Sequence, residues 1–397
     1  MDPLLGLIDA VEDSTFQQVI NNPETFQYQI RYTQVDRDQD NRPILTTFQY
    51  NTDHERYFYP ASTVKMPVAF LALQRINELH GQNEKIDKYS RLAYGAEVAP
   101  QAPMTIDSSS PSGYPHVAHF IEQIFSVSDN EAYNRLYEFL GQDYINDELR
   151  KKGVFNHSRI RTRVGIGGFD TEANKYTNPI KILDDRGEEL FGQNEYYALY
   201  DNYKDLDDMH RGRGYYDDDL DSVIMRPFDM SKKNFISLQD IEASLARVIF
   251  PDNFEIEERY NLSAKDYQFL YSIMPKYPLD FSYHYDHAEE YYNTYVKFFW
   301  DANDKTPIPE HIKIYNKVGW AYGTLTDCSY IVDLKNNVEF FLTATILVNR
   351  NEIYNDGEYE YESVGLPFFA TLGKAVFQYE LKRKRNRIPD LTKFIEE

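Results

Sequence analysis

Apolar residues recur at helical spacing in some stretches of the chain and alternate with polar ones in others. Residues 2–20 predict one amphipathic helix capped by Asp2, because one side of it carries Leu4, Leu5, Ile8, Val11 and Phe16. Residues 26–32 alternate as in a strand, and a second strand is predicted over residues 44–50 after the polar turn at 36–41. The chain is therefore expected to begin with a helix and a β-hairpin.

The middle of the chain predicts helices, and the last third returns to strands. Helices are expected over residues 62–79, 116–125 and 131–140, the last one ended by Gly141. Ser237 with Asp240, and Ser263 with Asp266, have the spacing of capping boxes that begin further helices. Strands are expected over residues 312–320, 329–334 and 338–348, with a turn at Asn336-Asn337, before a closing helix over residues 364–381.

The composition is that of a large folded protein with an acidic surface. Of the 397 residues, 42% are hydrophobic, including 25 Phe and 34 Tyr, which is ample for a core. The net charge of −22 (42 basic minus 64 acidic residues) argues against nucleic acid as a partner, because phosphate binding needs clustered cations. The one basic run, residues 382–385, is expected to end a helix, where cations suit the helix dipole.

Cysteine and histidine usage gives no support for a metal site. The single cysteine, Cys328, excludes an intrachain disulfide, and inside its expected strand it is predicted to be buried and inert. His284 and His287 lie three residues apart among carboxylates, but they do not complete a ligand set of the usual zinc type. No membrane-spanning segment and no signal peptide are predicted in the chain. We therefore expect no metal and no cofactor.

Candidate chemistry begins at Ser62-Thr63-Val64-Lys65, where a nucleophile and a potential base lie one helical turn apart. A turn with Pro60 precedes Ser62 and an apolar run follows it, so Ser62 is expected at a helix N-terminus, whose free N–H groups favour negative charge. Residues i and i+3 share a helix face, and a lysine in a partly dry site has a lowered pKa and can accept the serine proton. Alone, the same pattern also fits a helix cap followed by a surface lysine.

Two further motifs follow in order. Ser128-Asp129-Asn130 lies between two expected helices, and Lys317-Val318-Gly319 opens a strand-like segment that continues with Trp320. Taken singly, the first fits a helix N-cap and the second a strand end with a turn glycine. In this order, the three motifs are those of class A β-lactamases and penicillin-binding proteins. From about residue 26 to residue 381, with one large insertion, the chain resembles the class-A-like serine hydrolases.

This resemblance implies catalytic roles in acyl transfer for four residues. Ser62 would attack the carbonyl group of the substrate, and Lys65 would take the serine proton. Ser128 would relay a proton to the leaving nitrogen, and Lys317 would lower the cost of charge on the Ser128 hydroxyl.

The resemblance also implies a substrate-binding role for three residues. Asn130 would orient Lys65 and the substrate amide. The N–H groups of Ser62 and Trp320 would form the oxyanion hole. Gly319 would let the substrate come close to this backbone, since it carries no Cβ.

The chain departs from the family's pattern in two places. Val318 replaces a threonine or serine whose hydroxyl helps to bind the substrate carboxylate, which weakens the expectation of a penicillin or cephalosporin as the natural substrate. Class A β-lactamases also carry a glutamate four residues before an asparagine in an Ω-loop, where it activates the deacylating water. Here Glu172 precedes Asn174 by two positions and Asp170 precedes it by four, so either is a possible deacylation base or a solvated loop carboxylate. Rapid β-lactam hydrolysis is therefore not expected.

The family's fold implies an α/β (α+β) architecture, with an antiparallel sheet flanked by helices and an all-helical half. Residues 1–397 would form a single catalytic domain. Residues 1–60 and 231–397 would make its sheet-containing half, 61–174 its helical half with the Ω-loop region, and 175–230 an acidic, tyrosine-rich insertion. The tyrosines of the insertion fit either a binding face for sugar rings or an elaborate surface loop; they are Tyr196, Tyr197, Tyr200 and Tyr203.

The expected function is a serine hydrolase that forms a Ser62 acyl-enzyme with an amide or ester and is weak or slow as a true β-lactamase. Two alternatives stay open: a D,D-peptidase or esterase acting on cell-envelope acyl groups, and a non-catalytic penicillin-binding or sensor-type module. The expected partner is a small-molecule or peptidoglycan-like substrate, with no nucleic acid and no integral membrane segment, and the chain is expected to be a monomer. By resemblance it would work outside the cytoplasm, in the periplasm or cell envelope, with its signal segment absent from this chain.

Overall fold

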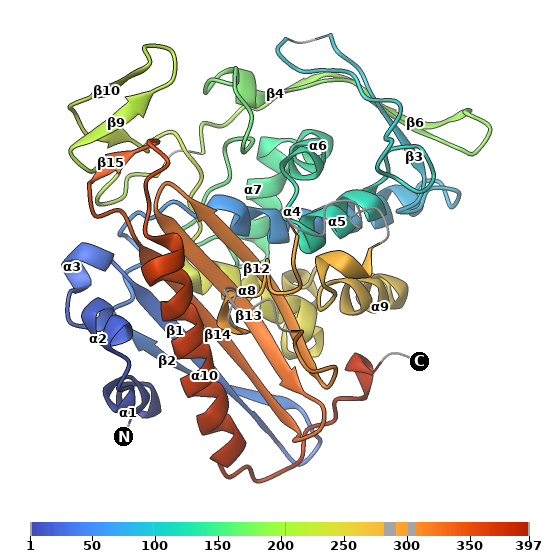
Figure 1. Cartoon of the computed structure of the whole chain (residues 1–397). Coiled ribbons are helices and arrows are strands. Elements are labelled where there is room, and N and C mark those ends of the chain that lie inside the picture. The colour runs from blue at the N-terminus through green and yellow to red at the C-terminus, as the bar shows by residue number, and fades with distance from the viewer. Residues whose placement is uncertain (1, 98, 203, 282–290, 301–306, 396–397) are drawn as a thin grey trace.

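The computed structural model describes residues 2–97, 99–202, 204–281, 291–300 and 307–395. Its centre is a five-stranded sheet in the order β12-β13-β14-β1-β2, in which every neighbouring pair is antiparallel (Figure 1). The strands are β1 (Gln29–Arg37), β2 (Pro43–Tyr50), β12 (Ile312–Ala321), β13 (Thr324–Asp333) and β14 (Val338–Leu347). The two ends of the chain therefore share one sheet, and β12 lies at its edge.

Helices cover both faces of the sheet because its central strands carry apolar side chains on both. On β13, Leu325 packs into one hydrophobic cluster and Cys328 into the other, as the alternation of a strand requires. The first face is covered by α10 (Leu366–Lys382), which crosses the sheet in Figure 1, together with α1 (Pro3–Ala10) and α2 (Ser14–Ile20). The second face packs against α8 (Leu238–Ile249). The predicted fold class, helices on an antiparallel sheet, is confirmed.

The helical half is built around α4 (Lys65–His80), which is buried along most of its length. It contacts α8 and three neighbours, α5 (Val117–Ser126), α6 (Asn130–Leu140) and α7 (Gln142–Lys151). A helix that is enclosed on nearly all sides cannot tilt or shift without opening the core. The N-terminus of α4 is therefore a rigid base for the residues that precede it.

Three predicted features differ from the structure for local reasons. The predicted first helix is two helices, because the Asp13 carboxylate accepts the N–H of Phe16 at 2.8 Å and begins α2. The first strand begins three residues later than predicted, since α3 (Pro23–Phe26) forms a helical turn before it. The carboxylate of Asp240 bonds to Ser158 and does not complete a capping box. The capping box of Ser263 and Asp266 at α9 (Ala264–Ile273) is confirmed.

The predicted insertion consists of short strands that attach to both halves. These are β4 (Tyr176–Thr177), β5 (Ile180–Leu183), β6 (Glu189–Gln193), β7 (Tyr196–Tyr197), β8 (His210–Arg211), β9 (Gly214–Asp217), β10 (Ser222–Ile224) and β11 (Phe228–Asp229). β5 pairs with β3 (Arg91–Tyr94) of the helical half, and β9 pairs with β15 (Ile353–Tyr354) near the end of the sheet half. Figure 1 shows these two attachments on opposite sides of the molecule.

The tyrosines of the insertion do not form one free face. The hydroxyl of Tyr196 donates to Asp143 at 2.7 Å, and that of Tyr197 donates to Glu172 at 2.7 Å. Tyr200 is exposed, and Tyr203 lies outside the described residues. Two of the four tyrosine hydroxyl groups thus hold the insertion against the helical half.

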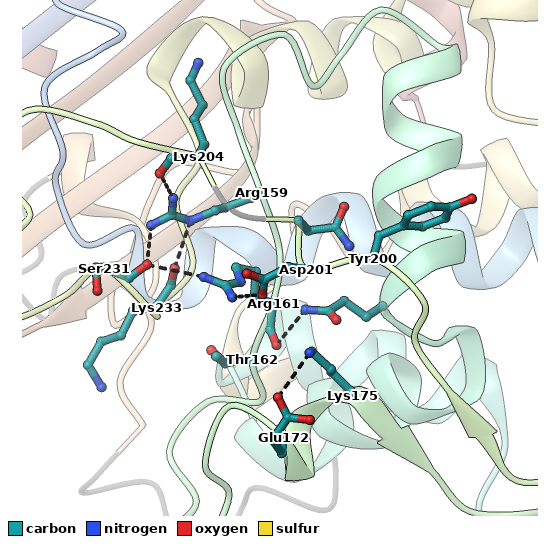
Figure 2. A network of polar contacts seen from close by, with 12 residues as sticks. Arg159, Arg161, Thr162, Glu172, Lys175, Tyr200, Asp201, Lys204, Ser231 and Lys233 are labelled. Carbon is teal, nitrogen blue, oxygen red and sulfur yellow. Dashed lines mark hydrogen bonds and ion pairs between the residues drawn. The ribbon is translucent and has the colours of Figure 1, made fainter.

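A buried guanidinium secures the other end of the insertion. Arg159 is 1% exposed, and it donates to the backbone carbonyls of Lys204, of Ser231 at 2.9 Å and of Lys233 at 3.2 Å (Figure 2). Arg161, two residues on, pairs with the carboxylate of Asp201. One side chain therefore satisfies several carbonyls of a segment that has few ladder hydrogen bonds of its own.

Within the described ranges, no helix is long and apolar enough to cross a membrane. The same residues include no cluster of three or more His, Cys, Asp and Glu side chains that could hold a metal ion. His284 and His287 lie outside the described residues. Cys328 is a buried free thiol, as predicted, and burial raises the pKa of this thiol.

Replacing Arg159 with methionine should destabilise the fold. The side chain keeps similar bulk, but several buried carbonyls lose their donor, so the free energy of unfolding should fall by about 3 kcal/mol or more. The thermal midpoint, measured by calorimetry, should drop by about 5 °C or more. Arg150→Met on the exposed face of α7 is the matched control and should cost less than about 1 kcal/mol. Equal midpoints for the two variants would contradict this role of Arg159.

Candidate active site

Ser62 lies in a 3-10 turn, Ala61–Val64, that leads directly into α4. Thr63 closes this turn, since its N–H and its hydroxyl both donate to the carbonyl of Pro60, at 3.1 and 2.7 Å. Ser62 is half-buried, whereas Lys65 begins α4 and is fully buried. The regular helix thus begins later than predicted, but Ser62 still lies at a helical N-terminus, where N–H groups favour developing negative charge.

Lys65 extends from the start of α4 to the loop that precedes α6. Its Nζ donates to Oδ1 of Asn130 at 2.6 Å and to the backbone carbonyl of Ser128 at 2.5 Å. Burial lowers the pKa of Lys65 to about 7, against a smaller opposing attraction from Asp129. Near neutral pH a large fraction of this lysine is therefore the free amine, which is able to accept a proton.

Ser128 connects the two lysines of the site. Nζ of Lys317 donates to Oγ of Ser128 at 2.7 Å and to the carbonyl of Val318 at 2.8 Å, while the Ser128 carbonyl accepts from Lys65. Ser128 has a φ of 60°, an uncommon conformation for a residue other than glycine. Asp129 caps α6 immediately afterwards and holds this turn in place. In this conformation the hydroxyl and the carbonyl of Ser128 each face a cation.

The two lysines influence each other's protonation. Lys317 is 2% exposed, and its pKa lies well below the usual value, first because of burial and second because of the neighbouring Lys65. Two ammonium groups in one dry site cannot both hold a full charge easily at neutral pH. A charge on Lys65 therefore adds to the effect of burial and lowers the pKa of Lys317 further.

The N–H of Trp320 points towards the open edge of the sheet. The two-residue turn Tyr322-Gly323 joins β12 to β13, and both turn residues have a positive φ, as the tightest hairpin turns require. Ala321 and Thr324, which flank the turn, are hydrogen-bonded to each other across the hairpin. In an antiparallel ladder the adjacent pair, Trp320 with Leu325, is not bonded in this way, so its N–H groups point away from the partner strand. β12 is the edge strand of the sheet, and among the described residues no further strand takes up this donor.

Gly319 lies directly against the turn that holds Ser62. A Cβ at this position would come within 2.5 Å of the Pro60 carbonyl oxygen, 2.9 Å of the Ser62 nitrogen and 3.0 Å of the Thr63 nitrogen. These are backbone atoms at the rigid start of α4, so they cannot turn aside as a flexible side chain would. Only glycine allows β12 and the Ser62 turn to come this close.

A cavity of about 220 Å³ lies between this turn, the Ser128 loop and β12. It is lined by Tyr59, Ala61, Ser62, Val127, Ser128, Asn130, Val164, Gly165, Tyr295, Val296, Phe298, Val318, Gly319, Trp320 and Ala321. Trp320 is 42% exposed and stacks on Tyr361, with ring centroids 5.4 Å apart. In the part of the chain that the structure describes, the lining exposes polar and apolar surface about equally and contains no carboxylate.

The predicted Ω-loop region reaches this cavity through Val164 and Gly165. Asn134 on α6 accepts from the N–H of Val164 at 2.9 Å and donates to its carbonyl at 3.0 Å. Gly165 lies so close to Asn130 that a Cβ would be 2.1 Å from the Asn130 Nδ2 atom. The loop is thus fixed firmly at the cavity, but the side chain it contributes there is aliphatic.

The two possible deacylation bases, Asp170 and Glu172, lie away from this cavity, as solvated loop carboxylates would. Asp170 is exposed, and its carboxylate accepts the N–H of Ala173 at 2.8 Å. Glu172 is also exposed and accepts from Lys175 at 3.1 Å (Figure 2). It accepts from the Tyr197 hydroxyl as well, at 2.7 Å. Both carboxylates stabilise the outer part of the loop, and neither lines the cavity.

The other predicted site residues gather around one cavity, but sequence reasoning missed much of its wall. Tyr59 and Val127 each lie next to a motif that the sequence analysis singled out, and that proximity was the signal for them. Tyr295, Val296 and Phe298 come from an aromatic stretch without a motif, so nothing in the sequence marked them.

Known proteins are similar to this chain in two ways. Residues 13–186 match the model of a family described as the Beta-lactamase enzyme family. This segment includes Ser62, Lys65, Ser128 and Asn130 but not Lys317. No curated protein matches the chain in sequence.

Solved structures extend the similarity to nearly the whole chain. A class A β-lactamase from Bacteroides cellulosilyticus DSM 14838 aligns with a TM-score of 0.51 at 12% identity, over 93% of this chain and 98% of that one. PBP-A aligns with a TM-score of 0.50 at 14% identity, over 95% of this chain and 97% of that one. The chain has a β-lactamase-like fold. At these identities the likeness establishes the fold of this β-lactamase-like protein, and its activity has to be argued from the site.

Gly319→Ala should nearly abolish chemistry at Ser62. The added methyl group has no room beside the Ser62 turn, so β12 must move outwards and carry the Trp320 N–H away from the cavity. Because a displacement of about 1 Å can cost a hundredfold in rate, labelling of Ser62 by a fluorophosphonate should slow by about that factor. Gly167→Ala, whose Cβ would meet nothing within 4 Å, is the matched control and should label normally. Normal labelling of Gly319→Ala would show that this close contact is dispensable.

Proposed function

We propose that the chain is a serine hydrolase whose Ser62 forms an acyl-enzyme with an amide or ester substrate. One observation carries the proposal: two buried lysines, one from α4 and one from β12, converge on Ser128 beside the cavity that Ser62 lines. Burying an ammonium group is costly, and two such groups meet here at one serine. Groups with strongly shifted pKa values beside a cavity are typical of proton-transfer sites.

The proposed acylation step uses five residues of the site. Neutral Lys65 accepts the proton of Ser62 as the serine Oγ attacks the carbonyl carbon of the substrate. The N–H groups of Ser62 and Trp320 stabilise the negative charge that develops on the carbonyl oxygen. Ser128 accepts a hydrogen bond from Lys317, so its own proton is free to pass to the leaving nitrogen or oxygen. The proton held by Lys65 then restores the Ser128 hydroxyl.

Deacylation is the weak half of the reaction. Hydrolysis of the acyl-enzyme needs a base that activates a water molecule next to the ester carbonyl. The described lining offers no carboxylate or histidine for this role, and Val164 occupies the position where the loop meets the cavity. We therefore propose that a penicilloyl adduct is long-lived and that the protein is feeble as a β-lactamase.

A D,D-peptidase or esterase acting on cell-envelope acyl groups is the second candidate function. Val318 favours the esterase of this pair, because this aliphatic side chain lines the cavity where a hydroxyl would help to bind a substrate carboxylate. A third candidate is a penicillin-binding or sensor-type module, which would be acylated in the same way and release no product. An extracytoplasmic location, a monomeric state and a single catalytic domain are part of this proposal.

The first prediction concerns acylation. Treatment with a fluorescent penicillin or a fluorophosphonate, followed by intact mass and peptide mapping, should place the adduct on Ser62. Lys65→Met should reduce the rate by about 10²–10⁴, as loss of a general base does, whereas Lys335→Met in the exposed β13–β14 turn should label normally. Equal adduct yield in Ser62→Ala would rule out this nucleophile.

The pH dependence of acylation is a separate prediction. The base is the neutral form of Lys65, and burial lowers the pKa of this lysine to about 7. The labelling rate should therefore rise with pH through a midpoint near 7 and be lost below it. A rate that stays flat from pH 5 to pH 9 would show that Lys65 is not the group that titrates.

The prediction for deacylation compares three loop positions. Asp170→Asn and Glu172→Gln should leave the lifetime of the penicilloyl adduct unchanged, since neither carboxylate lines the cavity. Val164→Glu brings a carboxylate to the cavity and should shorten that lifetime by at least about tenfold, with Val164→Gln as the matched control. Rapid nitrocefin hydrolysis by the parent protein that disappears in Glu172→Gln or Asp170→Asn would contradict the assignment.

A further inference from the structure

A buried polar network lies on the face of β12 opposite to Lys317. Lys297 is 1% exposed, and its Nζ donates to the carbonyls of Met274 and Ile314, at 2.8 and 2.9 Å, and to Oδ1 of Asn316 at 2.7 Å. All three hydrogens of the ammonium group are used in these bonds. An ammonium group buried in this way is tolerated only because each hydrogen has an acceptor.

Asn316 connects Lys297 to a buried carboxylate on the next strand. Its Nδ2 donates to Oδ1 of Asp327 at 2.9 Å and to the carbonyl of Val296 at 2.8 Å. Asp327 is fully buried and also accepts from the Ser329 hydroxyl at 2.8 Å and from the N–H of Phe298 at 3.1 Å. The amide and the carboxylate are therefore satisfied at every polar atom.

Two of these bonds end on the wall of the Ser62 cavity. The Val296 carbonyl and the Phe298 N–H belong to residues that line it, and the Phe298 ring stacks against Trp320 with centroids 6.2 Å apart. Residues 293–296 form turns, so no β-ladder fixes their position. The side chains of the network supply the bonds to the sheet that this wall lacks.

The network also places charge beside Lys317. Asn316 precedes Lys317 on β12, and Asp327 lies on the neighbouring strand. Asp327 raises the pKa of Lys317, whereas Lys297 and, more strongly, Lys65 lower it. Burial raises the pKa of Asp327 to about 6, so this carboxylate is ionised at and above neutral pH. Burial lowers the pKa of Lys297 to about 7, so above neutral pH the carboxylate is the dominant charge of the network.

We propose that Lys297, Asn316 and Asp327 act as one positioning unit, which fixes the cavity wall and helps Lys317 to remain protonated. This inference rests on the proposed acyl-enzyme function. A purely structural role would be served at least as well by apolar residues of similar volume, because such replacements are often neutral or stabilising. The network differs from apolar packing in two respects: it bonds to the wall backbone, and it sets charge next to a lysine of the site.

The first test asks whether the aromatic cavity wall is in place, by comparing the acylation rates of two esters. Pre-steady-state release of p-nitrophenol from p-nitrophenyl phenylacetate and from p-nitrophenyl acetate gives the acylation rates for a bulky and a small acyl group with the same leaving group. In Lys297→Met the ratio of the two rates should fall by about tenfold or more, because the aromatic wall is displaced from the bulky group. Lys335→Met should keep the parent ratio. Ser329→Ala, which removes one donor to Asp327, should lower the ratio by a smaller factor and serves if Lys297→Met does not fold.

The second test measures the charge on Lys317. In the proposed unit Lys317 acts in its protonated form, so the rate at which a fluorophosphonate labels Ser62 should fall at alkaline pH as this lysine loses its proton. Asp327→Asn removes the carboxylate that opposes this loss, and the alkaline limb should move to lower pH by about 0.5–1 unit. Asp185→Asn, in an exposed turn of the insertion, should leave the limb in place.

Equal slowing of both esters in Lys297→Met and Ser329→Ala, or an unshifted alkaline limb in Asp327→Asn, would overturn the positioning unit. These results differ from a failure of the proposed function itself. If Ser62 of the parent protein forms no adduct with either ester or with the fluorophosphonate, the acyl-enzyme function fails and the inference fails with it. Adducts on Ser62 with an unchanged rate ratio remove the inference alone.

Discussion

The burial of two ammonium groups around Ser128 is the constraint on which the rest of the site depends. Lys65 and Lys317 are almost completely withdrawn from water, and carbonyl, amide and hydroxyl oxygens replace the lost hydration. Such oxygens stabilise the cations only at short distances and good angles, so a small shift of any one of them raises the free energy of the charged form. The elements that carry these groups must therefore be held rigidly.

This need explains where the site lies in the fold. Lys65 extends from the start of α4, which is buried along most of its length in the helical half, and Lys317 from the edge of the main sheet. Ser128 lies in the loop between α5 and α6 and bonds to both lysines. It therefore joins the two halves of the molecule at the point where chemistry is proposed. Gly319 and Gly165 remove the methyl groups that would otherwise hold β12 and the loop away from this joint.

The motif residues could be predicted from the sequence because their geometry is mostly local. Ser62 and Lys65 are one turn apart in any helical conformation. Asp129 caps α6 because aspartate is one of the residues preferred at a helix N-cap. The cavity wall could not be predicted, since Val296 and Phe298 are bonded to the sheet through the side chains of Asn316 and Asp327. That contact requires the register of β12 on β13, which depends on residues far apart in the chain.

The loop shows what spacing along the sequence leaves open. Spacing from Asn174 selected Asp170 and Glu172, but Asn174 holds the outer part of the loop, where its Nδ2 bonds to the Asp170 carbonyl at 2.8 Å. The part that meets the cavity is held instead by Asn134, which binds both backbone groups of Val164. Asn134 lies on a different element, and a pairing between a helix and a loop 30 residues away leaves no spacing pattern in the sequence.

Capture and release of an acyl group thus depend on different parts of this molecule. The residues proposed for capture come from a core helix, a capped loop and a sheet edge, which hold one another in place through buried hydrogen bonds. Release would depend on what the loop presents at Val164, and the backbone there is fixed whatever its side chain is, because Asn134 binds only the main chain. A change of side chain at this one position alters the base available to water without disturbing the lysines. The fold can therefore keep a reactive Ser62 while the fate of its adduct varies independently.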